Sequence, residues 1–189
     1  MLYTKKGDDG KTKTFGCDQR ISKSSAIAEA LGALDEINSY LGLCKIKAIK
    51  ENKKNSNFLK INNLNFEDII LNVQENLFII QAEVAGSKIF LGEEKVNELE
   101  EIIKAIEKEL PPIKSFFISG GVKLAVYFDI ARTIARRAER RVVEVSEENK
   151  IEVNKNTLAY LNRLSSLLYA LARLTNHKFG ITEESPDYK

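Results

Sequence analysis

A cluster of arginines in the second half of the chain is the strongest chemical signal in the sequence. Segment 129–141 holds five arginines against one aspartate and one glutamate, a local charge of +3 in a chain whose formal charge is +2. Arg132, Arg136 and Arg140 recur every four residues, so on a helix they form a row of like charges that slightly destabilises it. Guanidinium groups bind phosphate and carboxylate through paired hydrogen bonds. The row therefore predicts a site for a triphosphate or for an acidic partner.

A salt-bridged helix exterior is the alternative explanation of the same arginines. Ala131, Ala135 and Ala138 favour a site, because small residues let a second helix approach closely and partly bury the neighbouring arginines. Farther along, Asn162 lies among leucines, so its amide must reach solvent or find a partner. That partner is either a ligand or a group within the protein, and the sequence leaves both open.

The N-terminal arm combines glycine, threonine and lysine in a way that suits phosphate oxygens. Glycines let backbone amides converge, and the hydroxyl and ammonium donors around them are Thr4, Lys5, Thr12, Lys13 and Lys23. The triplet at 10–12 is not a Walker motif, because Lys5 stands where that motif needs its first glycine. A mobile, lysine-rich terminus remains the alternative.

Several classes of chemistry are disfavoured by composition. Cys17 and Cys44 are too few for a disulfide framework, and a sole histidine, His177, cannot build a histidine metal site. The carboxylate pairs Asp8-Asp9 and Asp35-Glu36 have no nearby histidine, so acid–base hydrolysis has little support. The start of the chain lacks a secretory signal, and no apolar run approaches the roughly 20 residues of a membrane span. We therefore expect a cytoplasmic protein in a reducing compartment, with no membrane partner.

The elements that must position these residues are helices. The chain has 189 residues, 43% of them hydrophobic, which fits one domain, 1–189, with a packed core. Apolar residues return at helical spacing, and the expected helices span 26–43, 67–90, 96–110, 122–147 and 156–176. The polar stretch 45–57 is expected to be a surface loop or a frayed helix end, and strand signals are nearly absent. This predicts an all-α bundle of about five helices over 26–178, with an irregular arm at 1–25 and a polar tail at 179–189.

The chain resembles the PduO-type ATP:cob(I)alamin adenosyltransferases, the corrinoid adenosyltransferase family. The resemblance is carried by segments 3–8 through Lys23, 132–141 and 160–165, with further matches at 33–39 and 116–121. It covers nearly the whole chain. It implies a five-helix bundle that assembles as a homotrimer, with an active site at each subunit interface, and transfer of the 5′-deoxyadenosyl group of ATP to the cobalt of a reduced corrinoid.

The resemblance also implies roles for individual residues. The implied nucleotide-binding residues are Thr4, Lys5, Lys6, Gly7, Thr12, Lys13 and Lys23 on the arm, and Arg136, Arg137, Ala138, Glu139, Arg140 and Asn162 from the neighbouring protomer. Magnesium would be held mainly by the ATP phosphates, with Glu139 as a candidate ligand. The implied catalytic residues are Arg136, Phe116, Asp35 and Arg132, the last two paired across the interface.

The corrinoid side of the implied site rests on Phe116 and Ser166. Phe116 matches an apolar residue beneath the corrin ring, which denies the cobalt its lower ligand and eases its reduction. Ser166 stands where the family has an aspartate, and Ser119 where it has a proline, which implies a looser loop around Phe116. A flavoprotein reductase and an adenosylcobalamin-dependent acceptor enzyme are the expected protein partners.

Two other classes compete for the same arginines. One is a trimeric helical scaffold that binds an acidic protein, and nucleotide binding separates it from the enzyme. The other is a nucleic-acid-binding protein, which is disfavoured because no surface aromatics are interleaved with the basic row. We therefore expect no nucleic-acid partner.

Overall fold

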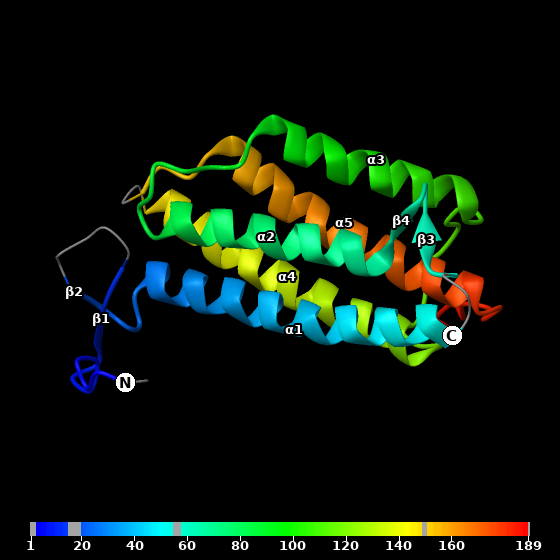
Figure 1. Ribbon diagram of the computed structural model, residues 1–189, viewed down its shortest axis with the longest axis horizontal. Helices are drawn as coiled ribbons and strands as arrows, with labels where there is room; N and C mark the ends of the chain where they lie inside the picture. The colour runs from blue at the N-terminus through cyan, green and yellow to red at the C-terminus, as the bar shows by residue number, and fades with distance from the viewer. Residues whose placement is uncertain (1–2, 15–19, 55–57, 149–150, 189) are drawn as a thin grey trace.

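The computed structural model describes residues 3–14, 20–54, 58–148 and 151–188, and its main body is a bundle of long helices (Figure 1). The helices are α1 (Ala26–Lys54), α2 (Phe66–Val84), α3 (Glu93–Glu109), α4 (Lys123–Glu147) and α5 (Lys155–Lys178). Two short hairpins accompany them, β1 (Lys11–Lys13) with β2 (Arg20–Ser22), and β3 (Lys60–Ile61) with β4 (Leu64–Asn65). The predicted all-α, five-helix bundle is confirmed, and the near-absence of strands is corrected by these hairpins.

The first helix is longer than its apolar pattern predicts. It continues to Lys54, so of the two expectations for 45–57, a surface loop or a helix end, the surface loop is wrong for residues 45–54, while residues 55–57 lie outside the described residues. Ala48 and Asn52 on this stretch are buried. The Asn52 amide explains why, because its Oδ1 accepts a hydrogen bond from Leu59 N at 2.7 Å and its Nδ2 donates to Glu67 Oε2 at 2.7 Å. A polar residue therefore fixes the end of α1 against the next connection.

The second helix is shorter than expected, because it ends at Val84 rather than at Phe90. The chain turns at Gly86, whose φ of +98° lies in the left-handed region that favours glycine. Leu91, which follows the helix, is nevertheless a core residue with 1% exposure. The third helix stops before Pro111-Pro112, as the proline pair predicts.

The core is built around α4, which packs against α1 and α5, while α3 packs on α5 (Figure 1). Ala131, Ala135 and Ala138 are at most 1% exposed, so the small residues let the helices approach closely, as expected. Buried Glu83 accepts hydrogen bonds from Asn154 N and Thr157 Oγ1, both at 2.5 Å, and so satisfies amide and hydroxyl donors at the start of α5. The described residues contain no helix long and apolar enough to cross a bilayer.

The N-terminal arm projects beyond the first turn of α1, away from the bundle (Figure 1). It is not wholly irregular, because β1 and β2 pair in antiparallel fashion with Thr12 opposite Ile21. Arg20 Nη2 contacts Asp9 Oδ1 at 2.7 Å and ties the turn before β1 to β2. The arm is thus a small ordered unit that one bundle leaves exposed.

Candidate functional site at the face of α4 and α5

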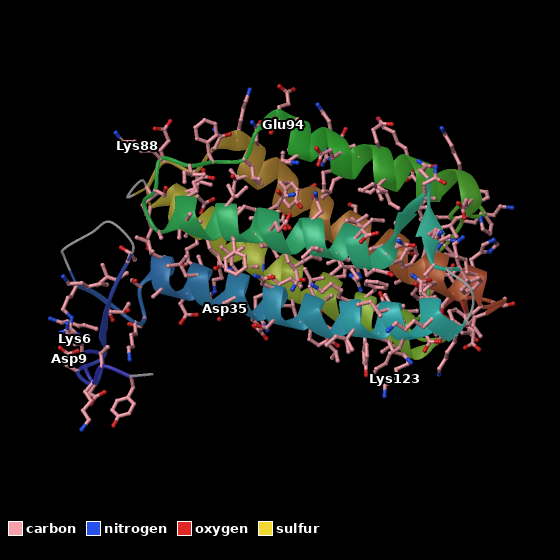
Figure 2. All side chains as sticks on the ribbon, viewed as in Figure 1. Lys6, Asp9, Asp35, Lys88, Glu94 and Lys123 are labelled. Atoms are coloured by element: carbon pink, nitrogen blue, oxygen red, sulfur yellow. The ribbon has the colours of Figure 1, made fainter. Side chains whose placement is uncertain are left out.

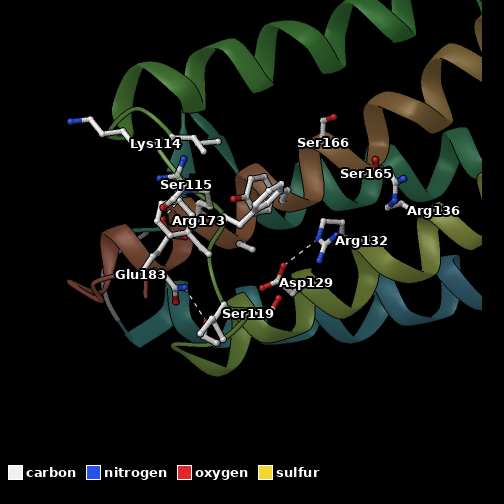
Figure 3. A pocket seen from close by; sticks show the side chains of 18 residues that line it. Lys114, Ser115, Ser119, Asp129, Arg132, Arg136, Ser165, Ser166, Arg173 and Glu183 are labelled. Carbon is white, nitrogen blue, oxygen red and sulfur yellow. Dashed lines mark hydrogen bonds and ion pairs between the residues drawn. The ribbon is translucent and has the colours of Figure 1, made fainter. Parts of the chain in front are cut away.

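A cavity of about 640 Å³ opens where α4, α5 and the loop 113–120 meet (Figure 3). It is lined by Ile113, Lys114, Ser115, Phe116, Phe117, Ile118, Ser119, Gly120, Asp129, Arg132, Arg136, Ser165, Ser166, Tyr169, Ala172, Arg173, Asn176 and Glu183. Four residues of the expected site or of its loop, Arg132, Arg136, Phe116 and Ser166, therefore face one space. Ser119, the other departure from the family pattern, is part of the same wall.

The α4 wall of the cavity is cationic. Arg132 Nε lies 3.3 Å from Asp129 Oδ1, one turn earlier on the helix, and the Arg132 guanidinium lies 6.0 Å from the ring centre of Tyr169. Burial raises the pKa of Tyr169, so its hydroxyl stays protonated. Arg136 is exposed, and its guanidinium has no hydrogen bond or ion pair with any other residue that the structure describes. An unpaired guanidinium at a cavity is available to an anion.

The next turn of α4 continues this wall toward α5. Asn162 Nδ2 donates a hydrogen bond to Glu139 Oε1 at 3.0 Å, which joins two expected nucleotide-binding residues from different helices. Arg140 is exposed, and its Nη1 donates to the carbonyl oxygen of Arg136 at 3.0 Å. The Arg140 guanidinium therefore folds back along the helix toward Arg136.

Arg137 and Arg141 on α4 do not line the cavity. Arg137 forms an ion pair with Glu36 on α1, and Arg141 pairs with Glu144 at 2.9 Å. Ala138 is fully buried, which gives its side chain a packing position between the helices. The arginines of α4 thus divide between a cavity side and an α1 side, and the sequence does not show which neighbour each side meets.

The loop between α3 and α4 supplies the apolar lip of the cavity. Phe116 is 79% exposed, and Ile113 and Ile118 on the same loop are more than half exposed. An apolar patch of this kind, rimmed by arginines, marks a binding surface.

The remaining expected residues lie elsewhere within one protomer. Asp35 is exposed on α1, and Lys6 lies on the projecting arm (Figure 2). On that arm Lys23 Nζ donates to Gly7 O at 2.8 Å, and a Cβ at Gly7 would lie 3.0 Å from the same nitrogen. None of the arm residues that the structure describes, 3–14 and 20–25, lines the cavity, so these parts of one protomer do not meet at one site.

The sequence pattern did not assign several cavity residues to the site, among them Asp129, Tyr169, Arg173, Asn176 and Glu183. Asp129 could have been found, since it lies one turn before Arg132. Arg173 is an arginine inside a leucine-rich face, and its burial at 5% exposure is the kind of polar exception that indicates a specific partner. Glu183 lies on the tail, where no periodic pattern places it.

No group of three or more histidine, cysteine, aspartate or glutamate side chains is arranged to hold a metal within the described ranges. Glu139 is the carboxylate nearest to the α4 arginines in sequence, and its second oxygen is not used in the hydrogen bond with Asn162. A magnesium ion carried by phosphate oxygens needs only one or two protein carboxylates. Glu139 fits that requirement.

Comparison with known proteins gives the family. Residues 2–175 match the cobalamin adenosyltransferase family. A corrinoid adenosyltransferase of Bacillus subtilis (strain 168) is 40% identical over 187 residues, covering 95% of this chain and 89% of the relative. The corrinoid adenosyltransferase PduO of Citrobacter freundii is 37% identical over 183 residues, but the match covers only 50% of that longer protein. This chain thus spans about half of the PduO relative.

Solved structures of the same family have a similar fold. A variant of the PduO-type ATP:corrinoid adenosyltransferase from Lactobacillus reuteri, complexed with cobalamin and ATP, superposes with a TM-score of 0.83 at 27% identity, covering 100% of this chain and 97% of that one. The helical fold is therefore that of the corrinoid adenosyltransferases. The chain belongs to the cobalamin adenosyltransferase family.

Proposed function

We propose that this chain transfers the 5′-deoxyadenosyl group of ATP to the cobalt of a reduced corrinoid at sites formed between protomers of a homotrimer. The observation that carries the proposal is the cavity, where the unpaired Arg136 and the apolar Phe116 face one space. The L. reuteri relative was solved with both ATP and cobalamin bound, which supports the same pair of substrates here.

ATP is bound by α4 of one protomer and the arm of the next. Arg136 and Arg140 lie one turn apart and offer their forks to the triphosphate. The Asn162–Glu139 pair leaves one carboxylate oxygen for a magnesium ion or a ribose hydroxyl. The arm supplies the other donors, from Thr4, Lys5, Lys6, Gly7, Thr12, Lys13 and Lys23. A projecting hairpin that its own bundle leaves exposed is suited to covering a neighbour's site.

The corrinoid lies in the cavity against Phe116. A flat, apolar macrocycle fits a lip built from Phe116, Ile113 and Ile118, since burying one large apolar side chain contributes about 1.5–3 kcal/mol. The same ring keeps water and other ligands from the lower face of the cobalt. Ser166 lines the opposite wall and offers a hydroxyl to the polar edge of the macrocycle.

The reaction is a substitution at the ribose carbon. The cobalt of the reduced corrinoid supplies an electron pair to C5′, a cobalt–carbon bond forms, and the bond from C5′ to the triphosphate oxygen breaks. No proton is transferred, so the site needs no general base. The protein contributes alignment of the two substrates. Arg136 and Arg140 stabilise the charge that grows on the leaving triphosphate.

Asp35 and Arg132 are proposed to meet across the subunit interface. Within one protomer Arg132 contacts Asp129, and Asp35 is exposed on α1 without a described ion pair. An interface that brings Asp35 to Arg132 would share the guanidinium between two carboxylates and fix its orientation above the cavity.

The test is to mix the protein with ATP, magnesium and chemically reduced cobalamin and to follow the corrin absorption spectrum. Formation of the cobalt–carbon bond, with one triphosphate released per corrinoid, supports the proposal. ATP binding without bond formation contradicts it and favours a nucleotide-binding scaffold. A cytoplasmic location, a flavoprotein reductase and a downstream adenosylcobalamin-dependent enzyme remain predictions, which fractionation and co-purification would check.

A further inference from the structure

The loop 111–122 is held at both ends by two buried residues near the end of α5. Arg173 and Asn176 are 5% and 6% exposed and lie one helical turn apart. The loop itself is largely exposed and carries Phe116 at its centre. We infer that Arg173 and Asn176 are positioning residues, which fix the loop so that Phe116 stands at the cavity in its working orientation. The inference rests on the proposed role of this cavity in binding the corrinoid.

Asn176 holds the C-terminal end of the loop. Its Nδ2 donates to Gly120 O at 3.0 Å, and its Oδ1 accepts from Val122 N at 3.1 Å, at the residue before the first turn of α4. Gly121 lies between these contacts with a φ of +93°, and a Cβ there would come within 2.2 Å of Asn176 Oδ1. Gly121 therefore lets the Asn176 side chain bind the backbone directly, and both its amide oxygen and its amide nitrogen are used in these bonds.

Arg173 holds the N-terminal end of the loop and the tail together. Its Nη2 donates to Pro111 O at 3.3 Å, and its guanidinium stacks 4.9 Å from the ring centre of Phe117, next to Phe116. Its Nε pairs with Glu183 Oε2 at 2.8 Å, as Figure 3 shows for the labelled side chains. A planar guanidinium makes these three contacts at once, which a lysine ammonium cannot do.

The C-terminal tail also forms hydrogen bonds with the loop. Ile118 N donates to Glu184 O at 2.8 Å, and Ser115 Oγ lies 2.7 Å from Ser185 Oγ. The sequence implied a looser loop, because Ser119 replaces a proline. The clamp by Arg173 and Asn176 supplies from α5 the restraint that a proline would have supplied locally.

Limited proteolysis tests the clamp without any substrate. Lys114 is exposed on the loop, so trypsin cleavage after Lys114, followed by mass spectrometry, reports loop opening. We expect Asn176→Ala to raise this cleavage rate roughly three- to tenfold, since it frees one end of the loop. Lys178→Ala is the control, because Lys178 lies on the same helix end but pairs with Glu109 on α3 at 3.1 Å. An unchanged rate in Asn176→Ala overturns the inference.

Steady-state kinetics test the consequence for the site. Asn176→Ala is expected to raise the corrinoid KM or lower kcat about tenfold or more, because a shift on the order of 1 Å misaligns the reactants. The Kd of ATP should stay within about twofold, since the clamp does not touch the α4 arginines. If the two residues only stabilised the fold, the substitution would instead weaken the binding of both substrates together. Faster cleavage with unchanged corrinoid kinetics also overturns the inference.

Two further variants keep the result interpretable. Arg173→Lys retains a charge for Glu183 but loses the stacked fork, so it is expected to show a smaller change in the same direction and serves if Asn176→Ala does not fold. Phe116→Ser separates this inference from the proposed function. Slow turnover in Phe116→Ser beside normal kinetics in the clamp variants overturns the clamp alone. Normal turnover in Phe116→Ser overturns the role proposed for Phe116. The proteolysis result alone then tests whether Arg173 and Asn176 fix the loop.

Discussion

Asn162 on α5 and Glu139 on α4 are joined by a hydrogen bond of 3.0 Å, from the amide nitrogen to one carboxylate oxygen. The bond crosses between the two helices that wall the cavity. It fixes the Glu139 carboxylate beside the arginine row and leaves one carboxylate oxygen outside this bond. This pair therefore connects the packing of the bundle to the chemistry of the nucleotide.

Glu139→Gln tests whether this carboxylate binds magnesium. The substitution keeps the size of the side chain and an acceptor oxygen for Asn162 but removes the charge. We expect the magnesium concentration for half-maximal rate to rise about tenfold, in line with the loss of one charge-assisted contact. Titration of activity with magnesium at saturating ATP measures it. Glu144→Gln, on the α1 side of α4, is the matched control, and an equal effect in both variants would refute a specific role for Glu139.

Arg136→Ala tests the unpaired guanidinium of the cavity. We expect ATP to bind about 10- to 100-fold more weakly, because a hydrogen bond to a charged group contributes roughly 1.5–3 kcal/mol. Isothermal titration with ATP and magnesium measures the Kd. Arg141→Ala removes an arginine from the same helix that already pairs with Glu144. If Arg141→Ala weakens ATP binding as much as Arg136→Ala does, binding depends on net charge alone. The proposed contact between Arg136 and the triphosphate is then wrong.

Phe116→Ser tests the apolar lip. Turnover should fall about tenfold or more while the Kd of ATP stays nearly unchanged, since the corrinoid loses an apolar surface worth about 1.5–3 kcal/mol. Rates at saturating ATP with varied corrinoid separate kcat from KM. Phe78→Ser is the control, because Phe78 is 63% exposed on α2 and does not line the cavity. A rise in the Kd of ATP that matches the loss of rate would argue against a corrinoid role.

Cys44 supplies a pH-dependent test of the packed core. Burial raises the pKa of the Cys44 thiol from 9.0 to about 12. In alkaline solution the unfolded chain therefore loses this proton first, and the native state is destabilised as the pH rises above 9. The difference in unfolding free energy between wild type and Cys44→Ala should shrink by about 1.4 kcal/mol per pH unit from pH 9 toward pH 11. Urea titrations at several pH values measure it, and a constant difference would show that the thiol is not desolvated.

Helical periodicity made the bundle predictable, because each long helix buries a recurring apolar stripe. The errors arose where polar residues decide the structure. Asn52 extends α1 through a polar stretch by hydrogen-bonding to Leu59 and Glu67, and periodicity does not register such bonds. The hairpin at β1 and β2 was missed because three-residue strands are too short to show alternation.

The cavity was predictable only in part. Arg132, Arg136 and Phe116 come from a charge row and a family resemblance, and both are visible in the sequence. The ion pair between Arg137 and Glu36 of α1 was not visible, because the sequence does not show which helix lies beside Arg137. The clamp by Arg173 and Asn176 was also invisible, since it joins groups more than 50 residues apart in the chain.

The central claim is that each ATP site takes its arm from one protomer and its arginines from the next. Two inactive variants test it, one with Lys5→Ala and Lys13→Ala in the arm and one with Arg136→Ala in α4, co-expressed with different tags and purified through both. In a closed cyclic trimer every mixed assembly contains one site with both parts intact, so activity should return to about one third of the wild-type value per trimer. Mixed assemblies as inactive as their parents would contradict the claim.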